Sequence, residues 1–312
     1  MLMRFRLGTW KPPQPLDVRK SIRSGAHAVS RSASRLLAAS VLVALCLAGT
    51  ARAAEEADWS MLEGYAIWAN RTLKSLPEGV QLLEPLARRL VELTSERRRE
   101  ADADLEPLET DPELLPAARA HALEMLERGY VDHVTPAGLD PSDRVALLLR
   151  RLVGGVGEKL AEHKGLAAEQ LEGQIGPLAV KIMDGLIQSP GHRENILNPD
   201  YTHLAIAAVA KGERVMVVQL FEARRALFAE PLPLHVSRDE KLPFSVEQGQ
   251  GLAVPAKYAY ARPGQPIQEL VTLDLSSAEV SIKPGAYFLK FLFPSEQTDR
   301  FEVADGPAIL VR

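Results

Sequence analysis

The sequence Ser-Pro-Gly-His-Arg-Glu-Asn-Ile-Leu at residues 189–197 is the part of the chain that most restricts the folds it can adopt. It contains His192, and a second histidine, His133, lies upstream at the end of Tyr-Val-Asp-His. Gly157-Glu158 stands between these two motifs. Because histidine and carboxylate side chains share acid–base and metal-binding chemistry, this order of motifs is also the first indication of a functional site.

Helical periodicity surrounds the motifs. We expect Asp111 to cap a helix that has Pro112 at its first position, and Gly129 to end that helix, so that His133 falls in the following loop. In the same way, Ser189 is expected to cap a short helix that has Pro190 at its first position and carries His192. The apolar faces of the two longer helices consist of Leu115, Ala118, Ala122, Met125 and Leu126, and of Leu171, Ile175, Leu178, Ile182 and Leu186.

Strand patterns dominate after His192. The apolar runs 204–210 and 215–221, with Lys-Gly-Glu between them, predict a hairpin. Beyond Pro-Leu-Pro at 231–233 the composition shifts to short runs typical of a small antiparallel β-sandwich. These predicted strands are 234–238, 258–262, 270–275, 279–283, 286–293, 300–304 and 309–312.

Taken together, the two histidine motifs, the glutamate between them and the apolar hairpin resemble the CAP superfamily, also called the SCP or cysteine-rich secretory protein family, and its bacterial secreted branch in particular. The resemblance covers roughly residues 90–223. It implies an α+β fold, a CAP-type α-β-α sandwich with a small antiparallel sheet, which a small all-β sandwich-like domain follows here. The expected organisation is a signal peptide (1–53), a helical segment (54–88), the CAP domain (89–230) and the β-domain (231–312).

The same resemblance identifies the candidate site residues. His133 matches the first family histidine, Glu158 the glutamate of a Gly-Glu-Asn motif, and His192 the second histidine. The chain departs from the family pattern at Lys159, where the family has asparagine, and at Leu186, where it has tryptophan. Ser189 takes the place of the second family acid, as it often does in bacterial members.

Two kinds of chemistry suit these residues. His133, His192 and Glu158 are a possible ligand set for Zn²⁺ or another divalent cation, and they are also candidates for acid–base catalysis. A purely structural role is the alternative, in which the histidines bond to backbone and Glu158 stands at a helix start. We expect Lys159 to face solvent or to pair with Glu158. Among the other histidines, His121 and His163 are expected to be solvated and His203 to be structural.

The ends and the charge of the chain restrict its location and partners. Basic residues precede an apolar run at 36–49, and Ala-Arg-Ala follows at 51–53, which predicts a secretory signal peptide cleaved after about Ala53. Removing the nine basic residues and one acid of 1–53 from totals of 37 and 41 leaves 28 and 40, a net charge of −12. Such a chain is a poor partner for nucleic acid. The single cysteine, Cys46, lies in the apolar run, so no disulfide is expected in the mature chain.

Three functions remain open. The first is a non-enzymatic binding protein of the periplasm, cell envelope or exterior, whose cleft binds a small ligand, a lipid, a cell-wall component or a divalent metal. The second is a hydrolase that uses metal or the His/Glu cluster. The third is a structural or adhesive envelope protein that docks a partner through its β-domain. The chain has no Gly-x-Ser-x-Gly and no His-Glu-x-x-His motif, and we expect no integral membrane span in the mature chain.

Overall fold

The computed structural model describes residues 16–17, 60–166, 170–295 and 300–312, without the side chains of residues 16, 17, 172, 190 and 192. The predicted signal peptide and Cys46 therefore lie outside the described residues, apart from the two-residue strand β1 (Leu16–Asp17), which pairs with Arg300 and Phe301. Among the described residues, no helix is both long enough and apolar enough to cross a membrane.

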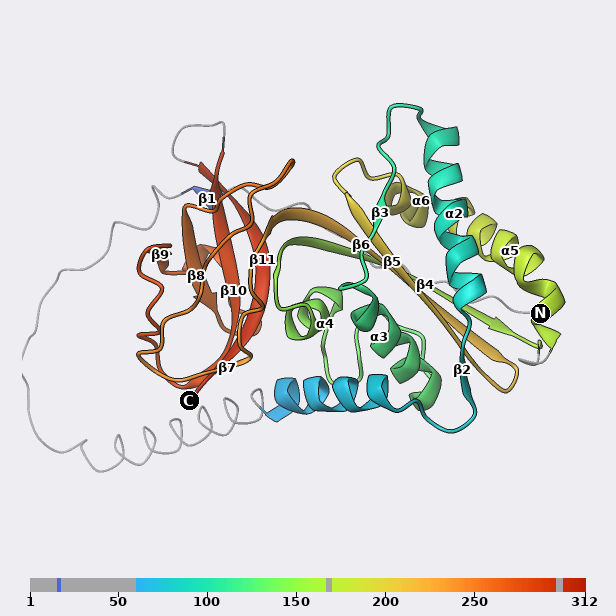
Figure 1. Ribbon diagram of the computed structural model, residues 1–312, viewed down its shortest axis with the longest axis horizontal. Helices are drawn as coiled ribbons and strands as arrows, with labels where there is room; N and C mark the ends of the chain where they lie inside the picture. Colours follow the sequence, from blue (N-terminus) through green and yellow to red (C-terminus); the bar gives the residue numbers. More distant parts are fainter. Residues whose placement is uncertain (1–15, 18–59, 167–169, 296–299) are drawn as a thin grey trace, which may run out of the picture.

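The first part of the molecule has three layers (Figure 1). A mainly antiparallel sheet, in which only the short β3 pairs in parallel with its neighbour β5 among the described strands of this part, forms the middle layer. Its two faces are covered by separate groups of helices, each with its own hydrophobic core. The strands are β2 (Val80–Leu82), β3 (Glu109–Thr110), β4 (Leu152–Lys164), β5 (His203–Lys211) and β6 (Arg214–Leu227). One face carries α2 (Glu84–Ala101), η3 (Glu172–Gln174), α5 (Ile175–Gln188) and α6 (Pro190–Ile196), and the other carries α3 (Leu115–Arg128) and α4 (Pro141–Leu148).

The C-terminal part is all-β, with its own core of aromatic and aliphatic side chains. Its strands do not form a separate sheet. They continue the first one through a bridge between Asp305 and Gly154, in the order β2-β5-β6-β4-β11-β10-β8-β9. Its elements are β7 (His235–Val236), β8 (Lys257–Ala261), η4 (Ile267–Glu269), β9 (Thr272–Asp274), β10 (Gly285–Pro294) and β11 (Arg300–Val311). The α+β fold class is thus confirmed.

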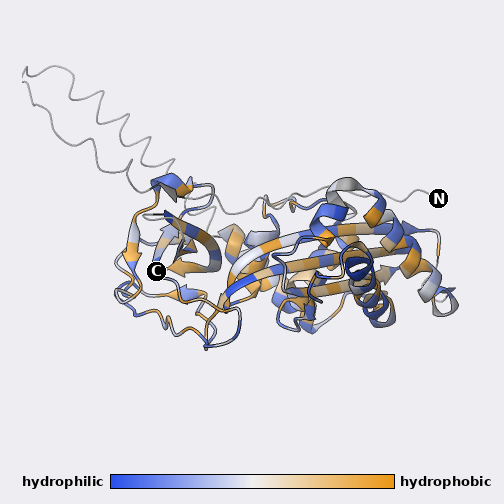
Figure 2. Ribbon diagram, turned by 90° about the horizontal axis from the view of Figure 1, so that it is seen from above, coloured by the Kyte–Doolittle hydropathy of each residue, from blue (hydrophilic) through white to orange (hydrophobic). Residues whose placement is uncertain are grey.

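The helix over residues 60–74 joins the two parts. Its Leu62, Tyr65 and Ala69 are buried, and they share a core with Ala146 of α4 and Phe288 of β10. Figure 2 shows hydrophobic residues along the strands of the sheet. The helix expected within residues 54–88 is confirmed for residues 60–74, and it packs between the layered part and the C-terminal strands.

Several predicted boundaries were right. Gly129 ends α3 with a left-handed φ of 73°, and the turn between β5 and β6 contains Gly212 with a φ of 57°. α6 begins at Pro190 after Ser189, as predicted, although the Ser189 side chain makes no capping hydrogen bond. Both strands of the hairpin are longer than the apolar runs that predicted them.

Other predictions were wrong. Asp111 does not cap α3, which begins four residues later; its Oδ1 instead accepts a hydrogen bond of 2.7 Å from the Glu113 N–H, and its Oδ2 pairs with Arg224. β4 and α4 were not predicted at all. The sequence of β4 contains glycines and charged residues that are typical of a loop, so its pattern does not predict a strand. In the structure it lies centrally and is buried on both faces. The predicted strands 300–304 and 309–312 are one strand, β11, and 279–283 contributes only an isolated bridge at Glu279.

Candidate functional site

The loop between α3 and α4 positions His133. Gly129 reverses the chain after α3, and the loop closes where Thr135 N–H donates to the Leu139 carbonyl over 2.9 Å. α4 then begins with a capping box, in which Asp140 Oδ1 accepts from Asp143 N–H over 2.9 Å and Asp143 Oδ2 accepts in return. His133 lies in a loop, as predicted, but it is only 6% exposed.

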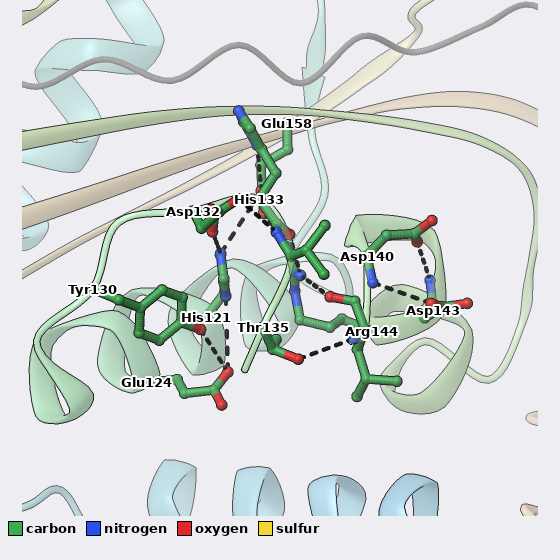
Figure 3. Close-up of polar contacts among 12 residues, drawn as sticks. His121, Glu124, Tyr130, Asp132, His133, Thr135, Asp140, Asp143, Arg144 and Glu158 are labelled. Carbon is green, nitrogen blue, oxygen red and sulfur yellow. Dashed lines mark hydrogen bonds and ion pairs between the residues drawn. The ribbon is translucent and has the colours of Figure 1, made fainter. Parts of the chain in front are cut away.

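Glu158 is the centre of the described site (Figure 3). It lies in the middle of β4 rather than at a helix start, and its side chain is buried against α3 and α4. One oxygen, Oε1, is 2.8 Å from His133 Nδ1, and the other, Oε2, accepts a hydrogen bond of 2.6 Å from Arg144. Arg144 also donates to the carbonyls of His133 and Leu139, over 2.7 and 2.9 Å. One guanidinium of α4 therefore fixes both the carboxylate and the loop that carries the histidine.

His121 of α3 completes this network, although the sequence had suggested a solvated side chain. It is 0% exposed, and its Nε2 lies 2.9 Å from the Asp132 carbonyl and 3.8 Å from Glu158 Oε1. Because a carbonyl oxygen can only accept, Nε2 carries the proton. Burial lowers the pKa of His121, so the ring is neutral at pH 7.

A second buried carboxylate extends the network behind His121. Glu124 lies one turn further along α3, at 4.0 Å from His121 Nδ1, and accepts a hydrogen bond of 3.0 Å from the Tyr130 hydroxyl. Burial and the charge of Glu124 raise the pKa of Tyr130 well above its usual value, so the hydroxyl keeps its proton and donates it.

The electrostatics keep Glu158 ionised. Burial alone would raise the pKa of its carboxyl, but the positive charge of Arg144, followed by His121 and the hydrogen bond from His133, outweighs burial and lowers the pKa to about 2. A carboxylate in this position accepts a hydrogen bond from His133 Nδ1–H and so fixes the tautomer of that ring. Nε2 is then the nitrogen through which His133 would bind a ligand or accept a proton.

The described residues fit a metal only in part. Both oxygens of Glu158 are engaged, one of them by a cation, so Glu158 suits the orientation of His133 better than direct coordination. Within the ranges that the structure describes, no group of three or more His, Cys, Asp or Glu side chains could hold a metal ion. The His192 side chain is outside the described set, so its convergence with His133 and Glu158 stays a prediction.

Lys159 and His163 differ most from expectation. His163 was expected to meet solvent, and Lys159 to face solvent or to pair with Glu158. Both instead lie in β4, where Lys159 is 0% exposed and His163 is buried. Because side chains alternate along a strand, Lys159 points to the face of the sheet opposite Glu158, toward α5 and α6. His203 is half-buried at the start of β5 and lies 2.8 Å from the Thr202 hydroxyl, which agrees with a structural role.

Comparison with known proteins finds a family model that matches part of the chain. Residues 89–221, from within α2 to within β6, match the model of the cysteine-rich secretory protein family, CAP. The uncharacterised protein YkwD of Bacillus subtilis is 32% identical over 141 residues, which are 45% of this chain and 48% of that protein. The chain thus spans about half the length of this curated relative.

Two solved structures are also similar. One is an outer surface protein from Borrelia burgdorferi, with 21% identity, coverage of 46% of this chain and 95% of that chain, and a TM-score of 0.37. The other is an extracellular protein containing a SCP domain from Bacillus anthracis, with 23% identity, coverage of 45% and 40%, and a TM-score of 0.35.

Proposed function

We propose that this protein is a secreted binding protein of the cell envelope or exterior. The match of residues 89–221 to the cysteine-rich secretory protein family supports this proposal. In this proposal His133, oriented by Glu158, binds a small ligand such as a cell-wall or lipid fragment, or a divalent metal such as Zn²⁺. The predicted signal peptide, residues 1–53, supports export. The observation that carries the binding site is the buried Glu158 carboxylate, which His133 and Arg144 hold between them.

The hydrogen-bond pattern supports binding through His133 Nε2. A ligating histidine typically donates its other ring nitrogen to a carboxylate, and His133 Nδ1 lies 2.8 Å from Glu158. Glu158 then has an orienting role, and His192, on α6, is the proposed second ligand. With Zn²⁺ bound, the two imidazoles would supply neutral nitrogen donors and the metal would polarise a bound ligand.

The pKa of Glu158 also favours binding over catalysis by that residue. A general base or acid works best with a pKa near the working pH, whereas Arg144 helps to lower the pKa of Glu158 to about 2. Glu158 therefore neither accepts nor gives up a proton at neutral pH.

A hydrolase is the second candidate, and one observation favours it. An imidazole held by a carboxylate at 2.8 Å is the arrangement of a general base and the group that orients it. In this version His133 would accept a proton from a bound nucleophile, and Glu158 would stabilise the imidazolium that forms.

Calorimetric titration of the mature chain tests the proposal, with Zn²⁺ and soluble cell-wall fragments as probes. We expect a saturable heat that His133→Ala and His192→Ala abolish and that Glu158→Gln weakens. His235→Ala is the matched control, because His235 lies on the C-terminal part and is exposed, and its Nε2 lies 2.7 Å from Glu63. Equal heats in all variants, or none with any probe, would overturn the proposal. Cleavage products in the fragment mixture, found by mass spectrometry and lost with His133→Ala, would establish the hydrolase instead.

A further inference from the structure

A cluster of charged side chains lies beside the short strand β3, near the start of α3. Glu222 of β6 is its centre and is 0% exposed. In the strand register, Glu222 is directly opposite His203 of β5 on one side and Val156 of β4 on the other. Residues paired in this way point to the same face, so Glu222 lies on the face of the sheet that α3 and α4 cover. It is a buried carboxyl group that the network around Glu158 does not use.

Two carboxyl groups share one guanidinium in this cluster. Arg224 donates from Nε to Glu222 Oε1 and from Nη2 to Asp111 Oδ2, over 2.5 Å in each case. The other oxygen of Glu222, Oε2, is buried and meets no N–H or O–H donor among the described residues. One positive charge therefore faces two acids, and a second negative charge would be buried without a counterion.

His203 does not supply a second positive charge. The Thr202 hydroxyl donates to the Glu222 carbonyl over 3.2 Å, so it accepts from His203 Nδ1 at 2.8 Å. Burial lowers the pKa of His203, and the charge of Arg224 lowers it further, so the ring is neutral at pH 7. The Nε2 atom lies 3.8 Å from Glu109 of β3, which is itself an acid and is exposed.

A nearby arginine is engaged elsewhere. Glu113 follows Asp111 on the connection to α3 and accepts a hydrogen bond of 2.6 Å from Arg151. Arg151 also pairs with Glu247 of the C-terminal part. Its charge is thus matched by two other acids and does not offset a charge on Glu222.

A proton resolves this excess of negative charge. Burial raises the pKa of Glu222 to about 7; the bond from Arg224 lowers this pKa in part, and the charge and hydrogen bond of Asp111 raise it. The O–H of a protonated Glu222 donates to Asp111, so the two carboxyl groups share one proton as well as one guanidinium. The cluster of three side chains is then neutral, and it becomes negative when the proton leaves.

The cluster holds the connection between β3 and α3. Glu109 and Asp111 donate their N–H groups to the carbonyls of Thr202 and Leu204, each over 3.0 Å. α3 begins without a side-chain capping hydrogen bond. Asp111 is therefore the side chain that ties this connection to β6, through Arg224.

We propose that Asp111, Glu222 and Arg224 form a pH-sensitive latch, which holds the connection before α3 to β6 in acid and loosens it above neutrality. On ionisation of Glu222, two carboxylates compete for one guanidinium and repel each other. The proposal does not depend on the binding function proposed for His133, which follows the opposite end of α3.

Urea unfolding of the full chain between about pH 4.5 and pH 8 tests the latch. The folded pKa of Glu222, about 7, is above its ordinary value of 4.5, so the folded state keeps a proton that the unfolded state releases. Stability therefore falls as the pH rises through this window and stays lower above it. We expect the urea midpoint of wild type to fall relative to that of Glu222→Gln, whose neutral amide still donates to Asp111. Asp111→Asn should reduce the fall, because only one carboxylate then remains on the guanidinium.

Two comparisons isolate Glu222. His203 titrates in a neighbouring window with the opposite sign, because its pKa is lowered, and it cancels in the difference between wild type and variant. Glu302→Gln is the matched control, since Glu302 also pairs with an arginine, Arg225 at 2.7 Å, but both side chains are partly exposed. This control should keep the fall seen in wild type.

Hydrogen exchange read by mass spectrometry localises the effect. After correction for the intrinsic rate, amides of 109–114 should exchange faster at about pH 8 than at about pH 6 in wild type, but not in Glu222→Gln. Amides of β10 should not change. Parallel pH profiles of the urea midpoint in wild type, Glu222→Gln and Asp111→Asn would overturn the proposal. An equal acceleration in β10 would overturn it too, because the change would then be global.

Discussion

The two faces of β4 treat buried charge in opposite ways. On one face, Glu158 accepts hydrogen bonds from His133 and Arg144 on both of its oxygens. On the other face, Lys159 lies beside Gln219, whose amide has no hydrogen-bond partner in the described parts of the chain. The difference shows that burial alone does not define a site: the first face is organised by its own side chains, and the second has an amide, that of Gln219, which no described side chain satisfies.

The largest expected effect is the removal of Glu158. Glu158→Ala leaves the Arg144 guanidinium buried without its carboxylate, which should cost about 3–5 kcal/mol of the free energy of unfolding. Urea unfolding at pH 7 measures it. Asp184→Ala is the control, because its exposed ion pair with Arg97 should be worth less than about 1 kcal/mol. A loss for Glu158→Ala as small as that of the control would mean that the network does not stabilise the fold.

The free energy of unfolding at acid pH should depend on the same carboxylate, that of Glu158. The folded pKa of Glu158 is about 2, below its ordinary value of 4.5, so its contribution is fully present above pH 4.5 and is lost as the pH falls toward 2. We expect the difference in stability between wild type and Glu158→Gln to shrink over this window, in urea titrations at several pH values. A difference that stays constant from about pH 5 to about pH 2 would contradict the lowered pKa.

Gly157→Ala tests how closely α6 and its flanking loop approach the second face. The added methyl group would lie 2.0 Å from the Tyr201 hydroxyl and 2.7 Å from Asn195 Oδ1, so these side chains must move. We expect a loss of about 1–3 kcal/mol in urea unfolding. Gly176→Ala in α5, where a Cβ meets nothing within 4 Å, is the matched control and should not be destabilising. Equal behaviour of the two variants would show that this contact is loose.

The smallest effect should have the opposite sign. Gln219→Met replaces an unbonded amide by an apolar chain of similar shape, so it should be neutral or stabilise the protein by about 1 kcal/mol. Urea unfolding measures this. A loss comparable to that of Glu158→Ala would show that both faces are equally organised, and the contrast between them would fail.

Local patterns in the sequence were enough for several parts of the fold. The apolar faces of α3 and α5, the left-handed Gly129 and the Gly212 turn depend on residues within a few positions of each other. They placed His133 in its loop and predicted the hairpin β5–β6. The motifs around His133, Glu158 and His192 were also sufficient to identify the family of residues 89–221, which the family match confirmed.

The tertiary structure decided what the sequence pattern hid. β4 carries glycines and charges that mimic a loop, and only its central place, between β6 and β11, makes it a strand. His121 was expected to be solvated, and nothing in the sequence pattern singled out Arg144. Both are buried because α3, α4 and β4 bring them to Glu158. The reason is physical: a buried charge is tolerated only where partners from distant segments meet it, and such partners leave no periodic trace in the chain.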